Sequence, residues 1–174
     1  MDKNGRNARA EGADMLLGEL QGNDLLYLLP HISGFLKFLG SLLDDTNARF
    51  ILLILECHNE LITQIPDTVK LHMEQFLANL LSVNLDSKTQ IKIVLYSLFK
   101  SLMMACKPIN VVDVLETQLD HKNPKMREDV INIITFGLLT FPSYEFHLEE
   151  LVKAILPSLT DQKRRVRQAS LECI

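Results

Sequence analysis

The sequence predicts an all-α protein, an α-solenoid of stacked helical hairpins, and three observations support this. Leu, Ile and Val dominate the apolar residues, while aromatic residues supply 6% of the chain and glycine only 7 positions, which favours helices packed on helices. Apolar residues recur at spacings of three and four between polar breaks. The breaks themselves recur with a period of about 40 residues.

The first expected helices show the pattern clearly. Residues 8–20 and 30–43 place alanine, leucine and isoleucine on one face, as an amphipathic helix does. After the polar break DDTN, residues 48–65 form the next apolar segment. This segment ends at Pro66, because proline cannot continue a helix. Residues 30–43 and 48–65 are therefore the two helices of one hairpin.

The same pair of helices recurs along the rest of the chain. Pro108 and Pro142 close second helices in the way that Pro66 does. The remaining expected helices are 68–83, 91–106, 109–119, 126–141 and a last pair that begins at His147, breaks at TDQKRR and continues to residue 174.

The polar breaks LLDDTNARF, NLDSKTQIK, QLDHKNPKMR and SLTDQKRRVR align on a leucine. Leu43, Leu85, Leu119 and Leu159 lie 42, 34 and 40 residues apart, a drifting period typical of HEAT and armadillo repeats. Such repeats stack, so turns of one kind line up along one edge. We expect one domain over residues 1–174, with about five repeats truncated at both ends, as a fragment of a longer array.

The helical spacing also predicts which side chains of the second helices are buried between repeats. Five apolar residues share these positions in the expected helices 91–106 and 126–141. The expected core residues are Leu95, Leu98, Ile133, Phe136 and Leu139.

Basic residues gather in the turns inside the repeats, although the net charge is −4. They are Arg6, Arg9, Arg49, Lys88, Lys92, Lys122, Lys125, Arg127, Lys163, Arg164, Arg165 and Arg167. The turns between repeats carry Asp67, Glu74, Asp113, Glu116, Glu145, Glu149 and Glu150. One edge is thus expected to be basic and the other acidic, and the basic edge attracts an acidic partner.

Two of these arginines are expected to have an internal role. Arg127 and Arg167 follow the apolar residues Met126 and Val166, where an arginine can pair with the aspartate of a neighbouring turn, such as Asp120 or Asp161. The basic residues that precede these positions are expected to point outward. They are Lys122, Lys125, Lys163, Arg164 and Arg165.

Other classes of protein find little support in the sequence. The histidines are scattered over different repeats and no catalytic or metal-binding motif is present, so we expect no enzyme, no cofactor and no metal. Cys57 and His58 are adjacent, but neighbouring helical residues point apart by about 100°, so both are expected to be packing or surface residues.

The cellular environment is also constrained. The three cysteines are odd in number and lie among apolar residues, which favours reduced thiols in a cytosolic protein. No signal peptide is evident and the longest apolar run, residues 50–55, is far below the roughly 20 residues of a membrane span. We therefore expect a soluble, intracellular domain that does not bind membranes.

Four segments carry a resemblance to a known family. HISGFLKFLGSLLDDTN, HKNPKMREDVINI, LLTFPSYEFHL and LTDQKRRVRQASLE resemble a TOG domain, the tubulin-binding HEAT array of microtubule polymerases, CLASPs and the ciliary crescerins. Within the family the chain is most similar to the second TOG domain of the crescerin group. The resemblance covers about residues 9–174.

The resemblance implies a tubulin-binding edge formed by the turns inside the repeats. The polymerase domains carry a tryptophan near the first turn, whereas this chain has no Trp and Arg6 lies near the matching place. The implied tubulin-binding residues are Arg6, Arg9, Asn47, Arg49, Lys88, Lys122, Asn123, Lys125, Lys163, Arg164 and Arg165, with Arg127 and Arg167 in structural roles.

Three functional hypotheses follow. The first is a non-catalytic module that binds tubulin or microtubules as a monomer, in the cytoplasm and cytoskeleton and, by resemblance, in the cilium. The second is a general HEAT or armadillo scaffold for another acidic partner. Nucleic-acid binding is the third, and the pI of about 5.7 and the absence of Trp for base stacking count against it.

Overall fold

The computed structural model describes residues 3–83 and 88–174, with side chains from residue 7 onward in these ranges. Every regular element in this described part is an α-helix or a 3-10 helix, which confirms the all-α prediction. Leu85 and the side chain of Arg6 lie outside the described residues. The chain divides into two compact units, residues 1–101 and residues 102–174, and each is described by itself.

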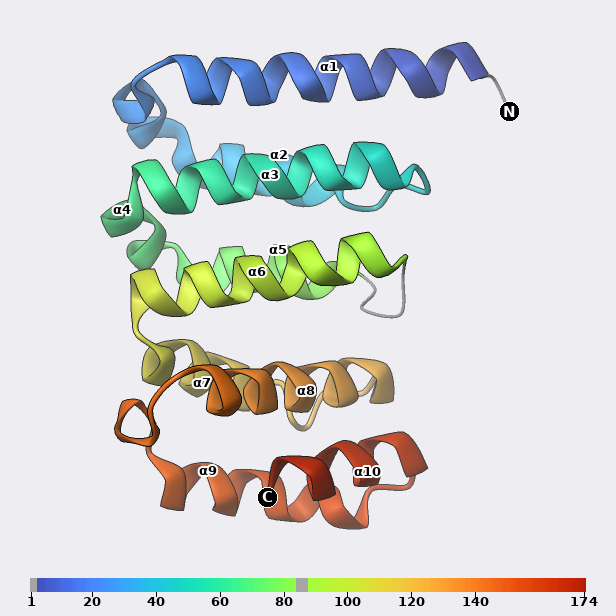
Figure 1. Cartoon of the computed structure of the whole chain (residues 1–174), viewed down its shortest axis with the longest axis vertical. Helices are drawn as coiled ribbons and strands as arrows, with labels where there is room; N and C mark the ends of the chain where they lie inside the picture. Colours follow the sequence, from blue (N-terminus) through green and yellow to red (C-terminus); the bar gives the residue numbers. More distant parts are fainter. Residues whose placement is uncertain (1–2, 84–87) are drawn as a thin grey trace. The chain divides into compact units, whose positions relative to one another are not determined.

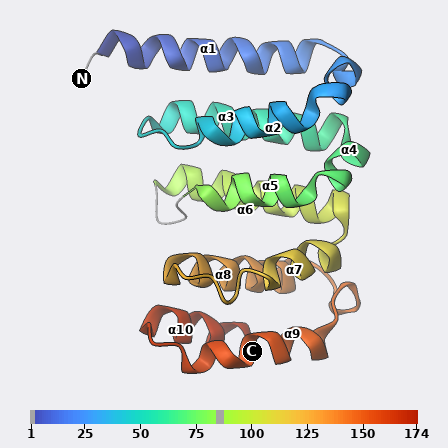
Figure 2. The same ribbon diagram turned by 180° about the vertical axis from the view of Figure 1, so that it is seen from behind.

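The first unit is built from two layers of helices (Figures 1 and 2). Helices α1 and α3 pack side by side in one layer, and α2 and α5 pack in the other, with α2 also against α3. The short α4 connects the layers. The elements are α1 (Lys3–Gly22), η1 (Leu25–His31), α2 (Ile32–Leu42), α3 (Ala48–Gln64), α4 (Pro66–Leu71), α5 (Met73–Ser82) and the first part of α6 (Thr89–Cys106).

The second unit repeats the hairpin plan. Helix α8 packs along α10 and against α7, and the 3-10 helix η3 packs against both α9 and α10. Its elements are the end of α6, α7 (Pro108–Glu116), α8 (Pro124–Thr140), η2 (Ser143–Glu145), α9 (Leu148–Ile155), η3 (Leu156–Thr160) and α10 (Arg164–Cys173). Pro66, Pro108 and Pro142 each follow a second helix and stand at or before the start of the next element, as predicted.

Two expected helices are broken. The single helix expected over residues 68–83 is interrupted at His72, whose backbone (φ −117°, ψ 21°) leaves the helical region and separates α4 from α5. The helix expected over residues 30–43 begins only at Ile32, because Pro30 lies in the preceding 3-10 turn. The first break has no glycine or proline to mark it.

The predicted core is mostly correct. Leu95, Leu98 and Ile133 are buried, and Phe136 is half-buried. Leu139 is 84% exposed, so its assignment to the core was wrong. Six residues after Ile133, at about 100° per residue, Leu139 has rotated away from the core face.

The stretch Leu25–Leu42 is long and apolar enough, by composition, to resemble a membrane span. It is not one continuous α-helix, since the 3-10 helix η1 gives way to α2 at His31. Leu25, Ile32 and Leu36 are buried inside the first unit. Only 22% of the stretch is buried, and Leu26, Tyr27 and Phe38 are among its exposed apolar residues.

A buried polar network joins three helices of the first unit. The Asn79 amide of α5 donates to the Leu36 carbonyl of α2 at 2.9 Å and to Nε2 of His58 in α3 at 3.1 Å. His58 Nδ1–H donates to the Ile54 carbonyl at 2.8 Å, and Gln75 donates to Asn79 Oδ1 at 3.0 Å. His58 is fully buried, as is its neighbour Cys57. His58 is therefore a packing residue with both ring nitrogens satisfied.

Gly40 makes room for this network. A Cβ atom at this position would lie 2.3 Å from Asn79 Oδ1, which is closer than atoms can approach. Gly34 in the same helix has nothing within 4 Å of the equivalent point. Only Gly40 is therefore required for packing, because α2 and α5 approach closely there.

We predict that Gly40→Ala lowers the free energy of unfolding by about 2 kcal/mol or more, since Asn79 must move and leave buried polar groups unpaired. Gly34→Ala is the matched control and should be neutral or stabilising by up to about 1 kcal/mol, because alanine favours helix. Urea unfolding of both variants checks this. Equal stability of the two would contradict the close approach at Gly40.

The same network predicts a pH dependence of stability. Burial lowers the pKa of His58 from 6.5 to about 4, against the opposing effect of its hydrogen bond to Ile54. Between these values the unfolded chain binds a proton that the folded chain does not. Stability is therefore full above pH 6.5 and falls by roughly 3 kcal/mol as the pH drops to about 4.

The measurement compares unfolding of the wild type and His58→Gln between pH 7 and pH 4.5. The variant lacks the titrating ring, so its stability should fall less steeply with acidification, while the other histidines and carboxylates contribute equally to both proteins. Parallel curves would show that His58 is not held neutral.

Candidate functional site

Three turns that precede second helices share one hydrogen-bonding frame. In each, a side chain accepts the backbone N–H two residues further on, which closes the turn. The pairs are Asn47 N–H to Asp45 Oδ1 at 2.7 Å, Asn123 N–H to His121 Nδ1 at 3.1 Å and Lys163 N–H to Asp161 Oδ1 at 2.7 Å.

The residue whose backbone N–H is bound in each turn is also the N-cap of the helix that follows. Asn47 accepts the N–H of Arg49 at 3.1 Å, and Asn123 accepts the N–H of Lys125 at 3.0 Å. Lys163 occupies the corresponding place before α10 without a side-chain capping bond. The first two turns thus satisfy donors that the helix itself cannot satisfy.

In the first unit, Arg9 of α1 reaches the turn before α3. Its guanidinium lies 3.2 Å from the carboxylate of Asp45, with the Arg9 side chain 51% exposed. Arg49 is exposed and Asn47 is half-buried. Lys88, exposed before α6, lies further along the same unit. The structure brings Arg9, Asn47 and Arg49 together at one turn.

In the second unit, Arg127 joins two successive turns. Its Nε and Nη2 donate to the two carboxylate oxygens of Asp161 at 2.8 and 3.1 Å, and its Nη1 donates to the His121 carbonyl at 2.6 Å. Arg167 donates to the main-chain oxygens of Asp161 and Gln162 at 2.7 and 3.2 Å. Arg127 thus pairs with the aspartate of the neighbouring turn, as expected. Arg167 instead binds main-chain oxygens of its own turn, so the expectation that it pairs with an aspartate of a neighbouring turn was wrong.

The carboxylate of Asp161 is held in its charged form. Burial alone would raise the pKa of Asp161, but the N–H of Lys163 and the guanidinium of Arg127 outweigh it and hold this pKa below its ordinary value. The same carboxylate thus closes its own turn and anchors Arg127. Loss of Arg127 would remove one of the groups that support this charge, which also include the N–H of Lys163 and the guanidinium of Arg167.

Most of the basic residues of these turns are exposed, as expected. Lys122 and Asn123 project before α8, and Lys163, Arg164 and Arg165 project at the start of α10. Lys125 does not point outward, and that expectation was wrong. Its ammonium lies 2.7 Å from Asp129, which is 7% exposed, so the buried carboxylate draws Lys125 back along the helix surface.

A small groove separates the two basic turns of the second unit. Its volume is about 260 Å³, and it runs between the start of α8 and the start of α10. Pro124 and Val166 supply apolar surface, and Lys163, Arg164 and Arg165 border it together with Lys125 and Glu128. The groove suits an acidic side chain whose stem packs on the apolar surface.

Acidic groups gather elsewhere in this unit, between α7 and α9. Burial, together with Asp113 and Glu150, raises the pKa of Glu116, and His147 opposes this shift. Mutual repulsion of these carboxylates is consistent with the charge segregation expected from the sequence. In this unit the basic residues Lys122, Lys163 and Arg164 thus lie at the turns before α8 and α10, and the acidic residues lie between α7 and α9.

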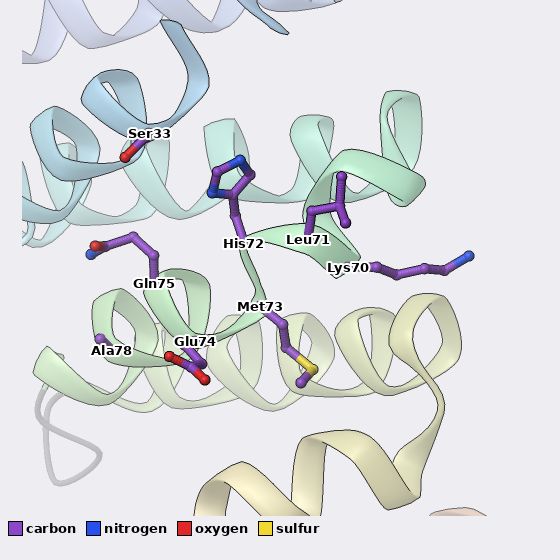
Figure 3. Close-up of a pocket in the computed structure, with 8 residues that line it drawn as sticks. All are labelled: Ser33, Lys70, Leu71, His72, Met73, Glu74, Gln75 and Ala78. Carbon is purple, nitrogen blue, oxygen red and sulfur yellow. The ribbon is translucent and has the colours of Figure 1, made fainter. Parts of the chain in front are cut away.

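The first unit holds a larger open groove of about 610 Å³ between the start of α2 and the α4–α5 connection. Figure 3 shows Ser33 on one side, with His72 and Gln75 across from it. Lys70 and Glu74 give it mixed charge. Within the described residues, no group of three or more His, Cys, Asp and Glu side chains is arranged to hold a metal ion.

In both units the helices pair into hairpins, and α3, α8 and α10 each follow a polar turn, which defines a HEAT-like helical-repeat protein. No family model matches the chain. It is 35% identical over 173 residues to TOG array regulator of axonemal microtubules protein 1 of mouse and of human, and 30% identical over 172 residues to the Caenorhabditis elegans crescerin-like protein che-12. Each alignment covers 98% of the chain but only 10% of the mouse and human proteins and 13% of the worm protein.

Solved structures agree with these relatives. A crescerin TOG domain structure superposes with a TM-score of 0.87 at 31% identity, over 99% of this chain and 74% of that one. The MAST/Orbit N-terminal domain, at 20% identity, has a TM-score of 0.75 over 99% of this chain and 76% of its own, and shows the shared fold alone. The chain belongs to the TOG domain family.

We predict that Arg127→Lys lowers the free energy of unfolding by about 1–3 kcal/mol, since lysine cannot reproduce the two-pronged bond to Asp161 and also reach the His121 carbonyl. Arg164→Lys, at an exposed position, is the control and should change stability by less than about 0.5 kcal/mol. Thermal unfolding of both variants at one pH checks this. Similar small changes for both would mean that Arg127 does not brace the turns.

Proposed function

We propose that this chain is a non-catalytic module that binds tubulin or microtubules through the turns inside its repeats and so regulates microtubule growth or stability. The mouse and human relatives are named as regulators of axonemal microtubules, and crescerin is described as regulating microtubules in the primary cilium. A place in the cytoskeleton, and in the cilium, is part of the proposal.

One observation carries the proposal more than any other. Lys122, Lys163 and Arg164 are all exposed beside two turns whose backbones are fixed by hydrogen bonds. Fixed turns present these charges in one arrangement, so an acidic surface gains their attraction without a large loss of backbone freedom. Tubulin, with its acidic surface, is the partner that the family assignment favours.

The first unit has a set of candidate residues of its own. Asn47, Arg49 and Lys88 are its candidates, together with Arg6 at the sequence level. Arg9 has a double role, because its guanidinium already pairs with Asp45 and yet remains half exposed. Lys125, Asn123 and Arg165 complete the second unit's candidates, and Lys125 and Arg165 line its groove.

The alternative is a general scaffold that binds a different acidic protein. The same basic turns would serve it, so the turns alone do not separate the two functions. Co-sedimentation of the chain with stabilised microtubules separates the two functions. We expect the chain to bind microtubules as a monomer, and we expect it to bind neither nucleic acid nor membranes.

We predict that the triple variant Lys122→Glu, Lys163→Glu, Arg164→Glu binds microtubules about tenfold or more weakly at low salt. Stability should change little, because the three side chains are exposed. The salt dependence of binding should also flatten, since exposed charges are screened over about 8 Å at physiological ionic strength.

The control carries the same charge change at exposed lysines outside these turns, namely Lys37, Lys100 and Lys107. It should bind far more tightly than the first variant. If the two triple variants lose equal affinity, binding responds to net charge and not to the turns. If neither the wild type nor any variant sediments with microtubules, the general scaffold becomes the better account.

A further inference from the structure

The three closed turns differ in the atom that closes them. Asp45 and Asp161 use a carboxylate oxygen at 2.7 Å from the backbone nitrogen, whereas His121 uses the ring nitrogen Nδ1 at 3.1 Å. His121 therefore stands in the place of the aspartate, one residue before Lys122 and two before the N-cap Asn123. Turns with the same hydrogen-bonding pattern are therefore closed by a carboxylate oxygen in two places and by an imidazole nitrogen in one.

The two acceptors respond differently to acid. A carboxylate accepts a hydrogen bond throughout the physiological pH range, but an imidazole nitrogen accepts one only while the ring is neutral and its hydrogen is on the other nitrogen. Histidine changes charge between about pH 5 and pH 8. In the protonated ring Nδ1–H would face the N–H of Asn123, so two donors would meet and the turn would lose its closing bond.

The charged groups around His121 belong to two elements and to the turn itself. Arg127 of α8 donates to the His121 carbonyl at 2.6 Å. The same guanidinium forms an ion pair with Asp161 of the turn before α10. Asp120 and Lys122 flank the histidine in the chain.

We propose that neutral His121 is a positioning residue, which orders the turn from Lys122 to Lys125 through its bond to Asn123 and makes this turn, unlike those closed by Asp45 and Asp161, sensitive to pH. The consequence for partner binding rests on the proposed function of this edge. Acidification would loosen the turn that presents Lys122 and caps α8, while the other two turns remain closed.

The turn itself is tested without any partner. The amide signals of Asn123, Lys163 and Asn47 are followed by two-dimensional NMR of the whole chain between pH 5.5 and pH 8. The Asn123 signal of the wild type should move in one proton step together with the ring signals of His121. Lys163 and Asn47, closed by carboxylates, should stay nearly still and serve as internal controls.

His121→Asn is the matched variant. Its side-chain oxygen can accept the same N–H, and it carries no charge at any pH in this range. Its Asn123 signal should not show the proton step. If the wild-type Asn123 signal stays still while the His121 ring titrates, or if the step persists in His121→Asn, the proposal is wrong.

Binding to stabilised microtubules then tests the consequence at constant ionic strength. Simple electrostatics predicts that the wild type gains affinity relative to His121→Asn at pH 6, because it gains a positive charge. Loss of the turn predicts the reverse, a wild type about fivefold weaker than the variant at pH 6 and equal to it at pH 7.5. If the wild type binds microtubules at pH 6 as tightly as His121→Asn does, or more tightly, the positioning role is wrong.

The two proposals fail in different ways. If no protein sediments with microtubules at either pH, the proposed function fails, and the NMR experiment still decides whether His121 closes its turn. If microtubules bind and the NMR step is absent, the function stands and His121 has no positioning role.

Discussion

The first backbone N–H groups of every α-helix have no acceptor within the helix, and this constraint shapes the turns before α3, α8 and α10. Short side chains solve it locally. Asp45, His121 and Asp161 close the turns, and Asn47 and Asn123 cap the helices that follow. Beside these turns, the basic side chains of Lys122, Lys163 and Arg164 are exposed.

Arginine side chains also connect these turns to neighbouring elements, and these bonds hold the turns in one geometry. In the second unit Arg127 binds its own turn through the His121 carbonyl and the next turn through Asp161. In the first unit Arg9 reaches Asp45 from α1. A partner that meets such a surface finds charges held at fixed places, so less conformational entropy is lost on binding than with flexible loops.

Much of this arrangement could be predicted from the sequence. Periodic leucines and the prolines after second helices are local signals, and they gave the hairpins and their turns correctly. The pairing of Arg127 with a neighbouring aspartate was also foreseen, because an arginine one place after an apolar residue at a helix start leans inward. The assignment to a second TOG domain and the list of binding residues remain predictions.

The predictions from sequence were wrong or incomplete where contacts between elements determine how a side chain points. Leu139 lies in the last turn of α8. In this turn Gly137, and not Leu139, faces the core, where it lies close to Met103. Lys125 is turned back by the nearly buried Asp129, a burial that no local pattern reveals. The His58–Asn79 network went unnoticed. Its one local sign is a glycine inside an amphipathic helix, and no sequence pattern tells Gly40 from Gly34 in the same helix.

The central claim, that an acidic tubulin surface docks on the turns inside the repeats, is tested most directly by zero-length cross-linking of lysine amines to tubulin carboxylates on assembled microtubules. Peptide mapping should place the links at Lys122 and Lys163, with Lys88 as a further site, and leave Lys37 and Lys100 unlinked. Links that occur chiefly through Lys37 or Lys100, or in equal amounts at all exposed lysines, would contradict it.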